Sequence, residues 1–68
     1  MPKQISSDAF LGILSANGFR FVSQRGSHAK YRNDQGHTVI VPHPRKDIPI
    51  GTLLSMIRQS GLPKKLFN

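Results

Sequence analysis

The chain has 68 residues and carries ten lysines and arginines against three aspartates, which gives a formal net charge of +7. A domain this short buries only about 60% of the surface that its unfolded chain exposes, so its core is thin and a deep cavity is excluded. The positive charge and a pI near 11 favour a polyanionic partner. We therefore expect the charge to bind nucleic acid rather than merely to keep a small protein soluble. The lack of cysteine excludes a disulfide framework and a thiolate metal site.

Repeats, linkers and low-complexity runs are absent from the sequence, so we expect one domain over residues 1–68. The N-terminal segment has no apolar stretch of signal-peptide length. No segment approaches the roughly 20 apolar residues that cross a membrane. These features predict a cytoplasmic protein that does not bind membranes.

The first predicted element is a helix over about residues 7–17. Ser6 and Ser7 are good N-cap residues, and Asp8 suits the positive end of the helix dipole. Asn17-Gly18 is a typical C-terminal stop. Apolar residues follow at helical spacing between these signals, namely Phe10, Leu11, Ile13 and Leu14.

Three short strands follow, at residues 19–22, 28–32 and 37–41. Their bulky and alternating side chains are typical of strands. The glycine-containing turns at 25–27 and 33–36 separate them, and such short connections predict a three-stranded antiparallel meander.

A second helix is predicted after the third strand. Pro42 and Pro44 end the strand, because proline cannot donate to the ladder. Pro49 suits a first helical turn, and Gly61 marks the end. The predicted core stripe consists of Ile50, Leu53, Leu54 and Ile57. The tail over residues 63–68 either frays or docks Leu66 and Phe67 onto the core.

The order α-β-β-β-α predicts an α+β fold in which both helices cover one face of the sheet and the other face stays open. The predicted inward side chains are Phe19, Phe21, Ala29, Tyr31, Val39 and Val41. The predicted outward side chains are Arg20, His28, Lys30, Arg32, Thr38 and Ile40. Alternation therefore places His28 among cations on the open face, where Ile40 is an apolar exception.

The acidic residues and histidines do not predict a metal site. Three aspartates lie in separate segments, whereas metal-dependent nucleases gather several carboxylates. The histidines lack the short-range spacing of zinc ligands. We expect no metal and no cofactor. The three aspartates are Asp8, Asp34 and Asp47, and the three histidines are His28, His37 and His43.

RNA cleavage is chemically possible without a metal, because the 2′-hydroxyl is a built-in nucleophile. His28 suits the proton transfers, and Lys30 and Arg32 suit stabilisation of the phosphorane. The same set would be powerless on DNA, which lacks that hydroxyl. On spacing alone, the favoured interpretation of His28 is an ordinary surface imidazole that stabilises the Gly26-Ser27 turn. His37 is interpreted as structural, and His43 as a loop residue for which a site role is the less favoured reading.

Several motifs in order resemble the HicA toxin family, also described as YcfA-like. The resemblance begins at the Gly26-Ser27-His28 segment and covers most of the chain. The matching segments are Asn17-Gly18-Phe19, residues 25–31, residues 38–47, residues 48–53 and residues 57–62. A lone Gly-Ser-His is a weak signal, whereas this ordered set is specific.

The resemblance implies a fold like that of a double-stranded RNA-binding domain. It implies an mRNA interferase, that is, an endoribonuclease toxin of a type II toxin–antitoxin pair, with His28 as the catalytic residue. It also implies a HicB-type antitoxin that covers the active face. The residues expected to bind RNA are Gly26, Ser27, Arg20, Arg25, Lys30, Arg32, Arg45 and Lys46. The alternative is a non-catalytic RNA-binding module of the same fold. No helix-turn-helix is present, so no direct DNA binding is expected.

Overall fold

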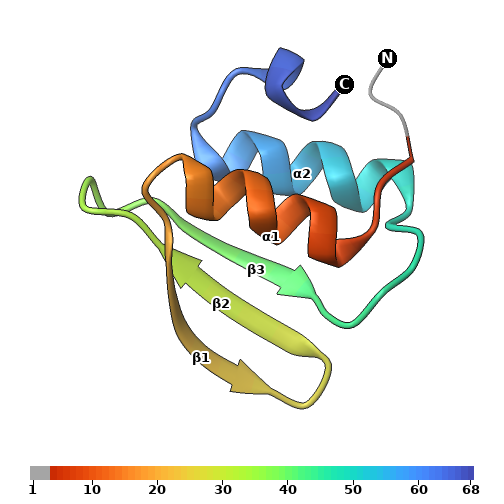
Figure 1. The fold of residues 1–68 in the computed structure, drawn as a ribbon, viewed down its shortest axis with the longest axis horizontal. Coiled ribbons are helices and arrows are strands. Elements are labelled where there is room, and N and C mark those ends of the chain that lie inside the picture. Colours follow the sequence, from red (N-terminus) through yellow and green to blue (C-terminus); the bar gives the residue numbers. More distant parts are fainter. Residues whose placement is uncertain (1–3) are drawn as a thin grey trace.

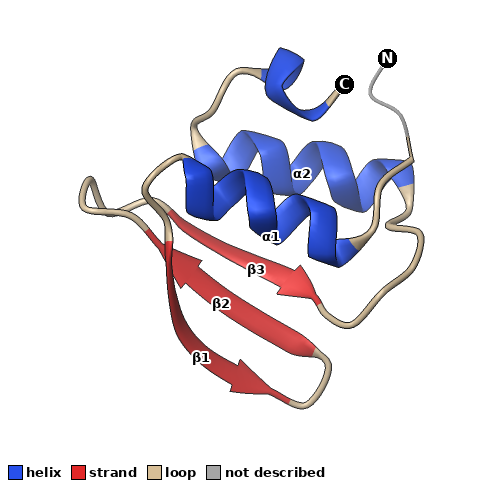
Figure 2. Cartoon of the chain, viewed as in Figure 1, coloured by secondary structure: helices blue, strands red, loops and turns tan. Residues whose placement is uncertain are grey.

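The computed structural model describes residues 4–68 and packs two helices against one side of a three-stranded antiparallel sheet (Figure 1). Residues 1–3, which the sequence analysis placed in the same domain, lie outside the described part. The elements are α1 (Ser7–Ala16), β1 (Arg20–Arg25), β2 (His28–Arg32), β3 (Thr38–Pro42), α2 (Ile50–Ser60) and the 3₁₀ helix η1 (Lys64–Phe67). The predicted α+β class and element order are confirmed, and the strand order is β1-β2-β3 (Figure 2).

Helix α1 begins and ends where its sequence signals predict. The hydroxyl of Ser6 caps it by accepting a hydrogen bond from the backbone N–H of Ala9 at 3.1 Å. Asp8 stands in the first turn, and Asn17 is the C-cap residue. Its buried apolar face, formed by Phe10, Leu11 and Leu14, lies toward the sheet and η1.

The helices cover β3 and leave β1 bare. Val39 and Val41 on β3 are fully buried, and Ala29 on β2 is only 1% exposed. No residue of β1 is buried. Figure 1 shows the same arrangement, with β1 as the strand farthest from both helices. Within residues 4–68, no helix lies on the other face of the sheet, as predicted.

Phe21 was predicted to be a core residue, and this prediction is wrong. It lies opposite Tyr31, so it projects to the helix-covered side as expected. Its side chain is nevertheless 57% exposed, because the helices do not extend as far as β1. The main apolar contact that remains is with the Tyr31 ring, edge to face, at a centroid distance of 5.8 Å.

The buried face of α2 is rotated from the predicted stripe. Leu53 and Ile57 are buried as expected, whereas Ile50 and Leu54 are exposed. Their places in the core are taken by Met56 and Ser60. Both sets fit a 3.6-residue period, so periodicity alone could not choose between them. Within residues 4–68, no helix is long and apolar enough to cross a membrane.

The C-terminal tail docks onto the core through one of its two apolar residues. Phe67 in η1 is 1% exposed and stacks on Phe10, with ring centroids 4.8 Å apart. Leu66 remains 38% exposed. The tail is therefore part of the packed structure, and α1 packs against β3 on one side and η1 on the other.

Candidate functional site

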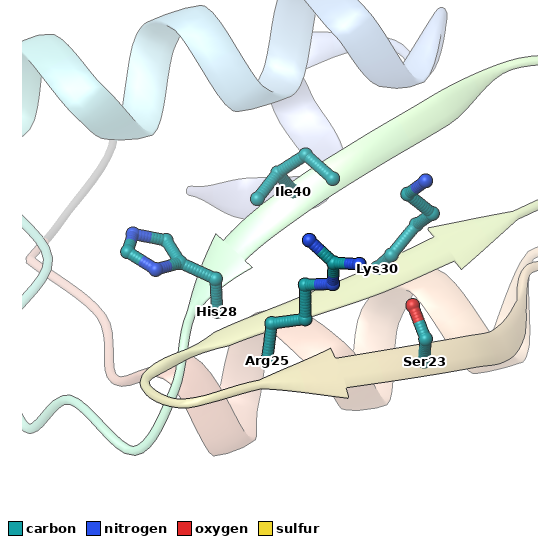
Figure 3. A pocket seen from close by; sticks show the side chains of 5 residues that line it. All are labelled: Ser23, Arg25, His28, Lys30 and Ile40. Carbon is teal, nitrogen blue, oxygen red and sulfur yellow. The ribbon is translucent and has the colours of Figure 1, made fainter.

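The open face of the sheet carries a hollow of about 500 Å³ whose walls come from all three strands. Its lining side chains are Ser23, Arg25, His28, Lys30 and Ile40 (Figure 3). The volume is comparable to that of small-molecule sites. Because the hollow is open to solvent, it could hold one monomer unit of a polymeric ligand while the rest of the polymer continues outside it.

Strand register explains how these residues meet. Arg25 stands opposite His28, and Ser23 stands opposite Lys30, across β1 and β2. On the other side of β2, Ile40 stands opposite Lys30. Directly opposed residues of an antiparallel pair project to the same face, so the register gathers two cations, a hydroxyl and an aliphatic side chain around the imidazole.

A β-bulge at Val22 brings β1 into this site. The register shifts between Phe21 and Ser23, which leaves Val22 as the extra residue. Without it, alternation would place Ser23 and Arg25 on the same side as Phe21, under the helix-covered face. The bulge reverses the phase and presents Arg25 beside His28.

The sequence predicts that Arg25 binds RNA from a turn, and neither the bulge nor Ser23 was predicted. The structure instead makes Arg25 the last residue of β1. The available signal was the spacing of Arg20 and Arg25, which are an odd number of residues apart. Two such residues share a face of one strand only if an extra residue lies between them.

His28 is the first residue of β2 and follows the tight turn at Gly26 and Ser27. Gly26 has a φ of 53°, in the left-handed region that glycine adopts without strain. The His28 side chain is exposed, and it makes no side-chain hydrogen bond to any other residue of the range 4–68. Both ring nitrogens are therefore available to a ligand on the open face.

Two predicted RNA-binding residues lie at the opposite end of the sheet from His28. Arg20 stands opposite Arg32 in the register, and neither lines the hollow. The guanidinium of Arg20 forms an exposed ion pair with Asp34 at 2.7 Å. The Nε of Arg32 donates to the hydroxyl of Thr38 at 3.2 Å. Of the predicted cations, only Arg25 and Lys30 are brought to His28.

Arg45 and Lys46 lie elsewhere, in the loop between β3 and α2. They line a second, smaller hollow of about 330 Å³ at the start of α1, together with Ser6, Ser7, Asp8 and Pro44. The predicted binding set is thus divided among three places on the surface.

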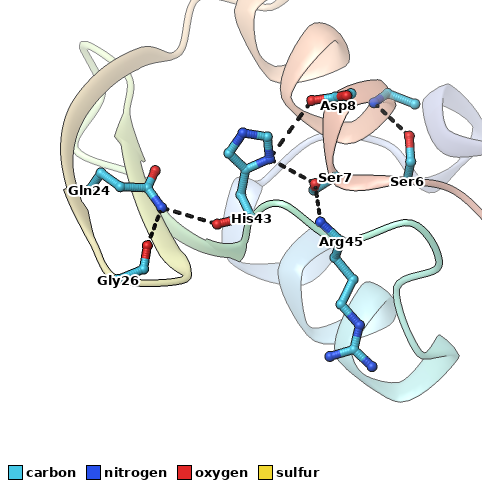
Figure 4. Close-up of polar contacts among 8 residues, drawn as sticks. Ser6, Ser7, Asp8, Gln24, Gly26, His43 and Arg45 are labelled. Atoms are coloured by element: carbon cyan, nitrogen blue, oxygen red, sulfur yellow. Dashed lines mark hydrogen bonds and ion pairs between the residues drawn. The ribbon is translucent and has the colours of Figure 1, made fainter.

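The contacts of His43 were not predicted from the sequence. Its ring Nδ1 lies 2.8 Å from the hydroxyl oxygen of Ser7 and 3.8 Å from a carboxylate oxygen of Asp8 (Figure 4). Its backbone N–H donates to the carbonyl of Ser27 at 2.8 Å. The Nε2 of Gln24 donates to its carbonyl at 3.1 Å. His43 therefore connects helix α1 with the turn that precedes His28.

The third histidine has structural surroundings, as interpreted from the sequence. The backbone N–H of His37 donates to the side-chain oxygen of Asn33 at 2.9 Å, within the β2–β3 turn. Its ring lies against Gly61, where an added Cβ atom would come within 2.7 Å of it. Within residues 4–68, no three histidine or acidic side chains gather into a group that could hold a metal ion.

Comparison with known proteins identifies one family. A family model described as the HicA toxin of bacterial toxin-antitoxin systems matches residues 7–62. The match includes every residue that lines the hollow and ends before η1. No curated protein matches the chain.

Proposed function

The chain belongs to the HicA toxin family, and we propose that it is a metal-independent endoribonuclease that cleaves mRNA with His28 as its catalytic acid–base residue. Toxins of this family belong to toxin–antitoxin pairs, so an antitoxin is its partner. The observation that carries the enzymatic proposal is the hollow on the open face, where the unpaired imidazole of His28 lies beside Arg25 and Lys30.

The proposed reaction uses the RNA's own nucleophile. His28 takes the proton from the 2′-hydroxyl, whose oxygen attacks the adjacent phosphorus while the bond from phosphorus to the 5′-oxygen breaks. The 5′-oxygen leaves with a proton supplied by a general acid, for which Lys30 is the candidate at this site. The products are a 2′,3′-cyclic phosphate and a 5′-hydroxyl.

The cations of the hollow suit the charge that this reaction develops. The phosphorane carries more negative charge than the phosphodiester, so nearby cations stabilise it more than they stabilise the bound substrate. Arg25 can present two parallel N–H donors to phosphate oxygens, whereas Lys30 acts as a point charge. Both approach from the same side as His28.

We further propose that a HicB-type antitoxin inhibits the toxin by covering the open face of the sheet. That face carries His28 and much of the exposed positive charge, and within residues 4–68 nothing else covers it. An acidic antitoxin surface would match the net charge of +7 and accelerate association. Bound there, it would exclude RNA from the hollow.

The test is incubation of the purified protein with single-stranded RNA in excess EDTA. The parent should release 2′,3′-cyclic phosphate ends, and His28→Gln should cleave at least about 100-fold more slowly, the usual scale for loss of acid–base catalysis. His37→Gln is the matched control and should cleave at the parent rate. Equal cleavage by His28→Gln would refute the assignment. RNA that the parent shifts on a gel without cleaving would show a non-catalytic RNA-binding module instead.

A further inference from the structure

The loop after β3 joins the candidate site to the packed body of the protein. Residues 43–45 contact the β1–β2 turn at one end and the first turn of α1 at the other. We propose that His43 is a positioning residue that holds His28 in place for RNA cleavage, a role that rests on the proposed function. His43 does not line the hollow and does not touch the substrate in this proposal.

On the hairpin side, both peptide groups of His43 are used. Its N–H donates to the carbonyl of Ser27, the residue directly before His28, at 2.8 Å. The side-chain amide of Gln24 donates both to the carbonyl of His43 at 3.1 Å and to that of Gly26 at 2.7 Å. Three hydrogen bonds thus tie this loop and the turn together. Figure 4 shows the two that Gln24 donates.

On the helix side, the imidazole is held by a serine that cannot move freely. Ser7 is 1% exposed, and its N–H donates to the carbonyl of Arg45 at 2.8 Å. Its hydroxyl oxygen accepts the N–H of Arg45, also at 2.8 Å. The same oxygen lies 2.8 Å from Nδ1 of His43, and it can donate its own hydrogen to that nitrogen or accept from it, according to the imidazole tautomer. This hydrogen bond anchors the ring to the start of α1.

Besides the β2–β3 ladder, which pairs His28 with Pro42, the position of the turn depends on this anchor, because the helices do not support it. No residue of β1 is buried, so the hairpin end projects beyond the core. The contacts through His43 are a direct path from the turn to the buried part of α1. Misplacement of a catalytic group by about 1 Å can cost on the order of 100-fold in rate. Loss of the ring contact should therefore slow the reaction while the cations still bind RNA.

The test compares His43→Ala, Ser7→Ala and the double variant with the parent on single-stranded RNA in EDTA, after urea unfolding has shown that each is folded. We expect kcat to fall about tenfold or more in each single variant and KM to change less than about threefold, because substrate-binding cations are untouched. The double variant should lose no more than the more damaging single one, since both break the contact between Ser7 and His43. The pH dependence of kcat should keep its shape.

His43→Asn provides the control for folding and for proton transfer. The asparagine side chain is short, like the Nδ1 edge of the imidazole, and its oxygen can accept from Ser7. We expect it to restore most of kcat. Parent-like kcat in His43→Ala, additive losses in the double variant, or loss of one limb of the pH profile would each overturn the positioning role. A parent that does not cleave RNA would instead refute the proposed function.

Discussion

Arg25 and His28 face each other directly across β1 and β2, at the two ends of the tight turn that closes the first hairpin. Both side chains project to the open face and line the same hollow. A phosphate drawn to the guanidinium would therefore lie beside the imidazole. This relationship makes Arg25 the cation whose contribution to catalysis can be separated most clearly from general attraction to RNA.

Arg25→Gln should lower kcat/KM for RNA cleavage by about 10-fold or more, because a donor aimed at the developing charge is lost. Arg20→Gln is the matched control. It removes the same charge from the same strand, but Arg20 lies at the far end and is paired with Asp34. Its effect should stay within about threefold. Equal losses in both variants would show that β1 supplies only non-specific electrostatic attraction.

Deletion of Val22 tests the role of the bulge. Removing the extra residue leaves Phe21 facing the helix side and both Ser23 and Arg25 facing the open side, so the site is preserved in a regular strand. We expect a folded protein that cleaves RNA within about threefold of the parent rate. Insertion of one alanine after Val22 should lower the cleavage rate more. The bulge would then hold two extra residues between Phe21 and Ser23, whose partners on β2 are unchanged. A deletion variant that is folded but inactive would show that the strand bend itself is needed.

The elements were predictable because capping residues, glycine turns and prolines act locally. Helix α1 and strand β2 lie where the sequence placed them, within a residue. The bulge was not predicted, because register is a property of two paired strands and the alternation within one strand does not reveal it.

The sequence also did not predict which side chains of the sheet the helices would cover. Phe21 has the alternation of an inward residue, but no helix extends over it. Leu54 has the spacing of a core residue, yet α2 is rotated so that Met56 is buried instead. The contact between Ser7 and His43 joins residues 36 positions apart, and no local pattern encodes such a pair. His28 was predicted as the catalytic candidate from its motif, and the structure places its side chain on the open face.

The same substitution should have opposite effects at two glycines. Gly26 has a φ of 53°, where an L-residue is strained, so Gly26→Ala should lower the free energy of unfolding by about 1–2 kcal/mol. Gly12 is an exposed residue inside α1 with open space around its Cα, so Gly12→Ala should raise that energy by about 0.5–1 kcal/mol. Urea unfolding of both variants measures the sign of each change in the free energy of unfolding. A stabilising Gly26→Ala would contradict the left-handed conformation of the turn.

Phe67 extends the core beyond the segment that matches the family, which ends at residue 62. Its ring is 1% exposed and stacks on Phe10, so Phe67→Ala should lower the free energy of unfolding by about 3–5 kcal/mol. Leu66→Ala is the neighbouring control. Its side chain is 38% exposed, and we expect a loss of about 1 kcal/mol or less. Since small domains have only about 5–15 kcal/mol in total, the Phe67 variant should be close to unfolding at 37 °C. Similar urea midpoints for the two variants would show that the tail contributes little to the core.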